Sequence, residues 1–206
     1  MPRTPLVTIV LALLLTLPLA GQETPQPPVP VQSLGGQDVA VLPITLVAID
    51  PAFEGDSLFA RYRDHRATLT WADSVIGGAL TERAPEVKWV LPPRLRKLAR
   101  RAPGLVDDPD EMGQAVLRSQ RLKEVPDQLR ASLRNLTALI NGRIVFVPAA
   151  LGFIKDQGGQ VRAELSLVAA DARSGRILWR SLPAAAGATP SAALAGALNL
   201  VLPLDQ

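Results

Sequence analysis

The fold is decided by an apolar run at residues 39–49, VAVLPITLVAI. An unbroken run of this kind, rich in β-branched residues, is typical of a strand that is covered on both faces of its sheet. Pro43 interrupts the run, and proline has no N–H to donate to a neighbouring strand. We therefore expect a buried strand whose regular pairing stops or bends at Pro43.

The segments that follow predict further helices and one short strand. Bulky residues recur every three or four positions over residues 58–80, which indicates one long amphipathic helix that carries His65 on its apolar face. The run VKWVL at 87–91 indicates a second strand. Helix-starting prolines and aspartates predict three more helices, which begin near residues 92, 108 and 126.

In the last third of the chain, apolar and polar residues alternate with the two-residue period that is typical of strands. Residues 143–153, 161–169 and 176–181 predict an antiparallel three-strand meander, with the turn DARSG at 171–175, and Thr189-Pro190 begins a final helix. The predicted fold is α/β (α+β): a single mixed sheet, β-α-β followed by helices, the meander and a C-terminal helix, with the 39–49 strand central. Trp89 and Trp179 are expected to be buried, and truncating Trp89 to cost about 3–5 kcal/mol.

The N-terminus has the pattern of a secretory signal peptide. Arg3 precedes an apolar run, and small residues follow at Ala20-Gly21. A retained membrane anchor is the alternative, but the run is short for a membrane span. We expect a signal peptide at 1–21, a Pro/Gly-rich tether at 22–37 and a single α/β domain at 38–206, without a transmembrane segment after cleavage. The mature protein is expected to be periplasmic or secreted.

Composition narrows the possible chemistry. The chain has 206 residues, 48% hydrophobic and 20% charged, with a formal net charge of +3. This small excess of basic residues is not typical of nucleic-acid-binding proteins. Because the sequence contains no cysteine, disulfides, thiolate metal sites and cysteine nucleophiles are excluded. No cofactor is expected, because no phosphate-binding glycine loop is found.

Candidate catalytic and metal-binding residues are few. His65 is the single histidine, and no G-x-S-x-G motif supplies a serine for it to activate. The acidic residues Asp107, Asp108, Asp110 and Glu111 are close enough in sequence to suggest Ca²⁺, but their spacing is not that of an EF-hand, and a helix cap accounts for three of them. No catalytic or metal site is therefore predicted. A hydrolase whose carboxylates meet only in the fold remains an alternative.

A basic segment is the sharpest charge feature. Its members are Arg94, Arg96, Lys97, Arg100 and Arg101, with no acidic residue between them. Leu95 and Leu98 stand beside them at helical spacing, so the segment predicts a basic amphipathic helix of the kind that meets anionic surfaces. A solvated helix face with its leucines in the core is the alternative. These five residues are the candidate interaction surface.

The order of elements resembles that of the CsgG-like and TolB-N-terminal-like domains of the bacterial envelope. The resemblance rests on VAVLP at 39–43, GRIV at 142–145 and DARSGRILW at 171–179, and it covers most of residues 38–202. It implies a non-enzymatic binding or assembly module whose partner is an envelope protein or an anionic envelope surface. The alternatives are a periplasmic carboxylate-based hydrolase and an accessory subunit of an outer-membrane secretion assembly. The sequence leaves the oligomeric state open.

Overall fold

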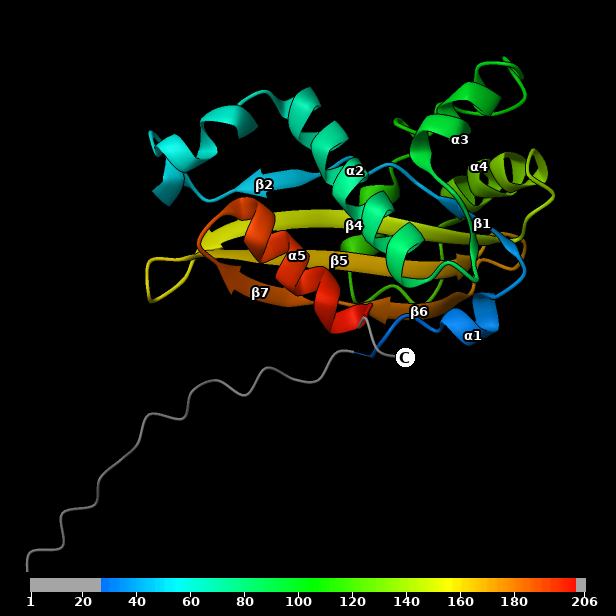
Figure 1. The fold of residues 1–206 in the computed structure, drawn as a ribbon. Helices are drawn as coiled ribbons and strands as arrows, with labels where there is room; N and C mark the ends of the chain where they lie inside the picture. Colours follow the sequence, from blue (N-terminus) through cyan, green and yellow to red (C-terminus); the bar gives the residue numbers. More distant parts are fainter. Residues whose placement is uncertain (1–26, 203–206) are drawn as a thin grey trace, which may run out of the picture.

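A seven-stranded mixed sheet forms the centre of the computed structural model, which describes residues 27–202 (Figure 1). The strands are β1 (Asp38–Val41), β2 (Val47–Ile49), β3 (Lys88–Val90), β4 (Ile144–Lys155), β5 (Val161–Asp171), β6 (Ile177–Ser181) and β7 (Ala184–Gly187). The α-helices are α1 (Val31–Leu34), α2 (His65–Arg83), α3 (Pro92–Ala99), α4 (Asp127–Ala138) and α5 (Pro190–Val201). Three 3₁₀ helices are η1 (Pro51–Phe53), η2 (Ser57–Tyr62) and η3 (Gln114–Arg118). The predicted α/β class with a single mixed sheet and a C-terminal helix is confirmed.

Pro43 divides the apolar run into two strands that share one row of the sheet. β1 ends before this proline and β2 begins after it, and both pair in parallel with β4. The predicted interruption is therefore confirmed. The central strand, however, is β4 and not the 39–49 segment, because β4 pairs along nearly its whole length with β5 and also accommodates β1 and β2.

Side chains alternate along the strands and supply a core on each face of the sheet. One core packs Val41 and Phe146 beneath α2 and α5, and the other packs Ala40 and Val145 against α3, α4 and η3. Because neighbouring residues point to opposite faces, a strand that is buried on both sides needs the continuous apolar runs seen in β1 and β4.

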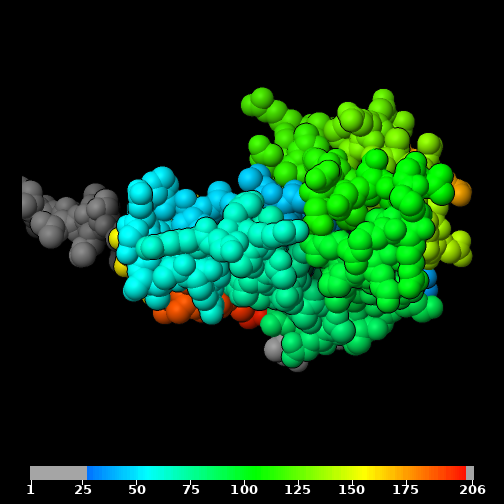
Figure 2. Space-filling view, turned by 90° about the horizontal axis from the view of Figure 1, so that it is seen from above, coloured from blue at the N-terminus to red at the C-terminus, as the bar shows by residue number. Residues whose placement is uncertain are grey.

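The second core covers only one half of its face. Its sheet residues come from the beginning of β4 and the end of β5, whereas Ala48, Gly152 and Glu164 in the other half are not part of it. Ala48 and Glu164 are exposed. Figure 2 shows the result: the end of the molecule built by residues 85–145 (green) is thicker than the end built by residues 45–65 (cyan). A step is left where the outer helical layer stops.

Two of the predicted helices differ in the structure. The helix expected over 58–80 is divided, because Asp64 accepts a hydrogen bond from Ala67 N (3.0 Å) and so starts α2 at His65, after the separate helix η2. His65 is therefore exposed at the start of α2 and does not lie on its apolar face. No helix begins near residue 108; the chain turns there and resumes only at η3, after Gly113 with its left-handed φ of 74°.

The N-terminal part of the domain also differs from the expectation. Residues 27–37 were expected to belong to the 22–37 tether, but Val29, Val31 and Leu34 are buried against the domain, and Val29 N donates to Val201 O (2.9 Å). The folded unit thus begins before residue 38. The predicted signal peptide at 1–21 lies outside the described residues. Within residues 27–202, no helix has both the length and the hydropathy needed to cross a membrane.

A further strand, β7, extends the meander beyond the three predicted strands. It pairs with the first half of β5, while β6 pairs with the second half. Its sequence AAAG shows no alternation of polar and apolar residues, which is why the period does not reveal it. Gly187 lies so close to α5 that an added Cβ would come within 2.6 Å of Ala193 N.

The turn between β5 and β6 is fixed by Asp171. Its Oδ1 accepts hydrogen bonds from the backbone N–H groups of Arg173 (2.9 Å) and Ser174 (3.2 Å), and its Oδ2 accepts from Arg143 Nε (2.8 Å). Only 6% of the Asp171 side chain is exposed. The Arg143 guanidinium, helped by these N–H groups, holds the pKa of Asp171 well below its ordinary value.

We predict that Asp171→Asn lowers stability at neutral pH and flattens its pH dependence in acid. Because the pKa of Asp171 is lower in the folded than in the unfolded chain, its stabilisation is complete above the unfolded pKa of about 4 and is lost as the pH falls below it. Urea unfolding at several pH values from about 7 to 2 measures this. Asp156→Asn is the control, because Asp156 also accepts a turn N–H, from Gln160 (2.7 Å), but is only partly buried and has no cation partner among the described residues. If the free energy of unfolding of Asp171→Asn fell as steeply in acid as that of the wild type, Asp171 would not be the source of the pH dependence.

The two tryptophans differ in burial, which corrects one expected stability effect. Trp179 is buried as predicted (9% exposed), whereas Trp89 lies in the edge strand β3 and is only partly buried. Both rings contact Phe146, with centroids 5.6 Å from Trp89 and 6.0 Å from Trp179. We expect Phe146→Ala to cost about 3–5 kcal/mol. Trp89→Ala should cost less, and equal costs in urea unfolding would show that Trp89 is fully part of the core.

Candidate functional site

The predicted basic helix exists as α3, and its apolar side anchors it to the domain. Leu95 is buried in the second core, Leu98 packs against that core, and Ala99 is also buried. Pro92 and Pro93 fit the first turn of the helix, because the backbone N–H groups there have no acceptor within the helix. Four members of the candidate interaction surface are exposed: Arg94, Lys97, Arg100 and Arg101. At 100° per residue Arg94 and Lys97 project away from Leu95 and Ala99, and Arg101 follows the end of the helix. Arg100 comes one turn after Arg96 and lies at the border of the same side.

Arg96 is different, because it turns toward two carboxylates. Its guanidinium donates to both oxygens of Asp110, from Nε at 2.8 Å and Nη2 at 2.7 Å, and Nη2 also donates to Asp73 at 2.9 Å. The sequence shows no acidic residue within the basic segment, but the fold brings two to Arg96. The hydrogen bond and charge of Asp110 raise the pKa of Arg96 above its ordinary value. Arg96 therefore belongs to the structure of the domain more than to its free basic surface.

Asp73 connects this ion pair to the central sheet. It projects from α2 with only 6% of its side chain exposed, and its Oδ1 accepts a hydrogen bond from Ile44 N (2.8 Å). Burial raises the pKa of Asp73, while the Ile44 N–H and Arg96 act in the opposite direction. The carboxylate thus joins α2, α3 and the break in the strand after Pro43. The sequence offered one signal for such an acceptor, because the N–H of Ile44, beside the strand-breaking Pro43, cannot be left without a partner when buried.

The acidic segment at 107–111 is held by the protein's own groups. Asp108 Oδ1 accepts the hydrogen bond of Asp110 N (3.0 Å), Asp110 binds Arg96, and Asp107 accepts from the Ser132 hydroxyl. The expected helix cap is therefore replaced by a turn and an ion pair. Among the described residues, no group of three or more His, Cys, Asp or Glu side chains is arranged to hold a metal ion.

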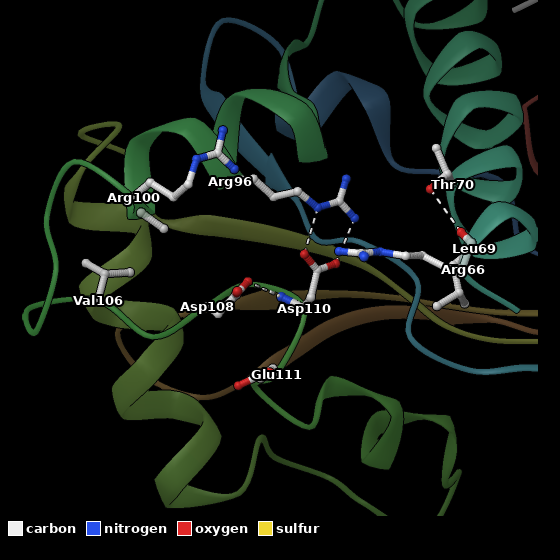
Figure 3. Close-up of a pocket in the computed structure, with 10 residues that line it drawn as sticks. Arg66, Leu69, Thr70, Arg96, Arg100, Val106, Asp108, Asp110 and Glu111 are labelled. Carbon is white, nitrogen blue, oxygen red and sulfur yellow. Dashed lines mark hydrogen bonds and ion pairs between the residues drawn. The ribbon is translucent and has the colours of Figure 1, made fainter.

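A cleft of about 600 Å³ lies between α2, α3 and this acidic segment (Figure 3). Arg66, Arg96 and Arg100 line the side formed by the two helices, and Asp108, Asp110 and Glu111 line the opposite side. Figure 3 shows Arg66 reaching from α2 toward Asp110, the ion-pair partner of Arg96. Opposite charges therefore face each other across the cleft, and the Arg96–Asp110 ion pair joins its two sides.

The potential catalytic residues are not brought together. His65 is exposed at the start of α2 and does not line the cleft. Asp73 and Asp110 converge, but Arg96 lies between them and holds both, and only Asp110 lines the cleft. Two carboxylates that are hydrogen-bonded to one partly buried guanidinium form a structural ion-pair network.

We predict that Arg96→Ala destabilises the domain by about 1.5–3 kcal/mol, the usual range for hydrogen bonds to charged groups. The loss is expected because Asp73 would remain buried without its cation. Lys97→Ala, one position away and exposed, is the matched control and should change stability by less than about 0.5 kcal/mol. Urea unfolding of both variants checks this, and similar costs for the two would contradict a structural role for Arg96.

Comparisons with known proteins give only distant structural likeness. No protein-family model matches the sequence, and the search of curated proteins finds no match. The LpoB C-terminal domain from Salmonella enterica is 14% identical, with 73% of this chain and 82% of that chain covered and a TM-score of 0.41. The PelC dodecamer from Paraburkholderia phytofirmans is 13% identical (88% and 90% covered, TM-score 0.38), and lipoprotein GNA1162 from Neisseria meningitidis is 11% identical (73% and 81% covered, TM-score 0.34). Likeness at this level gives no basis for assigning a function, and the resemblance to CsgG-like and TolB-N-terminal-like domains stays a prediction.

Proposed function

We propose that the protein is an exported, non-enzymatic binding or assembly module of the bacterial envelope. Its contact surface is the outward side of α3, and its partner is an envelope protein or an anionic envelope surface. Of the five residues of the candidate interaction surface, Arg94, Lys97, Arg100 and Arg101 make the contact, and Arg96 holds the helix in place.

The observation that carries the proposal is the division of these cations by the fold. None of the four exposed cations has an ion-pair partner within residues 27–202. Arg94, Lys97 and Arg101 lie on the outward side, and Arg100 lies at its border with the cleft. The helix that carries them is fixed by the buried Leu95 and by the bonds from Arg96 to α2 and to the acidic segment. A rigid helix with unpaired cations on one side presents a positive field without needing to reorganise when a partner arrives.

The expected compartment favours an anionic partner other than nucleic acid. The signal peptide pattern at residues 1–21 predicts export, and the net charge of +3 is too small for a general polyanion binder. In the envelope, lipid head groups and acidic protein faces are the anionic surfaces that such a helix meets.

Reversal of the outward cations tests the proposal. We expect the triple variant Arg94→Glu, Lys97→Glu, Arg101→Glu to keep its unfolding transition and to lose at least about tenfold in affinity for phosphatidylglycerol vesicles at low salt, since each basic residue near such a surface contributes about 1 kcal/mol. Vesicles of phosphatidylcholine are the uncharged control. The matched variant Arg121→Glu, Lys123→Glu, Arg134→Glu makes the same change of charge at exposed positions elsewhere.

A second arm distinguishes an acidic protein from a lipid surface. Because the chain has no cysteine, Lys97→Cys supplies a single crosslinking site in the exported protein. A protein partner is identified if the crosslink forms in the wild-type background and disappears when Arg94 and Arg101 are reversed, while the wild-type protein does not bind vesicles. If neither vesicle binding nor a crosslink depends on these cations, the outward side of α3 is only solvated surface and the proposal is wrong.

A further inference from the structure

Some positions in the sheet are occupied by two short strands placed end to end, which we call a row, and one row is incomplete. β1 and β2 together occupy one row beside β4, and β6 and β7 together occupy the row beside β5, so both rows have a strand at each end. The outer row next to β1 and β2 holds only β3, which pairs with β1. Among residues 27–202, no strand pairs with the outer edge of β2.

The backbone of β2 shows which groups this edge presents. Leu46 O accepts from Leu151 N (3.0 Å) and Asp50 N donates to Phe153 O (2.8 Å), so alternate residues from Leu46 to Asp50 direct their backbone groups toward β4. Val47 and Ile49, between them, therefore direct their N–H and C=O groups away from β4. Neither amide has a hydrogen-bond partner within the described part of the chain.

A hollow lies beside β2 on each face of the sheet. On the α2 face, a hollow of about 660 Å³ is lined by Ile49, Phe53 and Phe59 together with Asp50 and the turn that follows. Figure 1 places η1 and η2 at this end of the sheet, next to the end of β2. Phe53 and Phe59 are stacked, with ring centroids 4.4 Å apart, and form an apolar floor.

On the opposite face, a hollow of about 410 Å³ lies at the step in the molecular surface that Figure 2 shows. It is lined by Leu46, Ala48 and Gly152, and by Ser166 of β5 farther across the sheet. Ser166 is only 5% exposed, and its hydroxyl has no hydrogen-bond partner. A buried hydroxyl without a partner costs free energy, and a group that covered this half of the sheet would satisfy it.

We propose that β2 is a docking edge to which an extended segment of a protein partner adds as a further strand. The segment fills the outer row in line with β3 and bonds to the backbone of Val47 and Ile49. Its side chains alternate between the faces, so that an apolar side chain enters the hollow floored by Phe53 and Phe59, while the rest of the partner covers the step. In this mode of recognition the main chain supplies affinity and the alternating hollows supply specificity.

This docking edge goes beyond the proposed function, because it lies away from α3 and uses backbone groups instead of charge. The other occupant to be considered is a second copy of the chain. The exposed strand is only three residues long, and it is flanked by hollows that accept side chains, which fits a flexible peptide segment better than a preformed sheet.

A pair of variants at Val47 isolates the backbone contribution. Proline at this position removes the outward N–H and leaves the bonds between β2 and β4, whereas Val47→Ala shortens the side chain and keeps the N–H. Peptides selected from a random display library on the full mature chain are the probe. We expect the selected peptides to bind Val47→Ala with little loss and Val47→Pro at least about tenfold more weakly, the effect of one lost hydrogen bond.

Amide exchange of the same protein provides a readout that does not depend on a folded proline variant. In the free protein the Val47 and Ile49 amides should exchange faster than that of Ala48, and bound peptide should protect them. Ala48→Lys, which places a charge at the edge, should abolish binding, while the exposed Ala131→Lys on α4 should not. Reversal of Arg94, Lys97 and Arg101 should leave peptide binding unchanged, so the two proposals fail separately.

Three results would overturn the docking edge. One is that the library yields no peptide that binds the wild type. Another is that the selected peptides leave the exchange of the Val47 and Ile49 amides unchanged. The third is that the protein associates with itself in solution and Ala48→Lys abolishes that association, which would identify the occupant as a second copy of the chain.

Discussion

The break in the strand at Pro43 is the constraint from which most of this structure follows. Pairing with β4 stops after Leu42, whose N–H donates to Phe146 O (2.9 Å), and it resumes at β2. The polar groups exposed at the break are then satisfied from other elements. Asp73 accepts the N–H of Ile44, and Gln114 Nε2 donates to the carbonyl of Pro43 (3.0 Å). One interruption thereby fixes α2 and η3 against the sheet.

The same interruption determines how the cations are used. Asp73 is buried because it caps the break, and a buried carboxylate needs a cation, which Arg96 supplies. Arg96 in turn draws Asp110 and the acidic segment against α3. The remaining four basic residues are exposed, and no carboxylate of the described chain pairs with them. A cluster that looks uniform in sequence thus divides into one structural cation and four exposed cations without an ion-pair partner in the described chain.

The local patterns predicted the fold better than they predicted the site. The apolar run at 39–49, the alternation in β5 and the capping residues at Thr189-Pro190 act through neighbours in the chain, so their sequence periods reveal the elements. Asp73 and Arg96 are 23 positions apart and meet only through tertiary packing, which no local period encodes. The helix expected near residue 108 failed for the same reason, because Asp110 is used by a distant arginine and not by a helix start.

Pro43 also explains why the two ends of the molecule offer different kinds of surface. Before the break, β1 is flanked by β3 and β4, and the α3 and α4 layer covers the far face, so the contact surface proposed at this end consists of side chains, chiefly cations. After the break, β2 is flanked only by β4, the outer layer is absent on one face, and backbone groups face outward. Contacts with the cations weaken over a Debye length of about 8 Å at physiological salt, whereas main-chain hydrogen bonds at β2 are short-ranged and little affected by salt. Salt therefore separates the two surfaces physically: an interaction through α3 should weaken as salt rises, and one through β2 should persist.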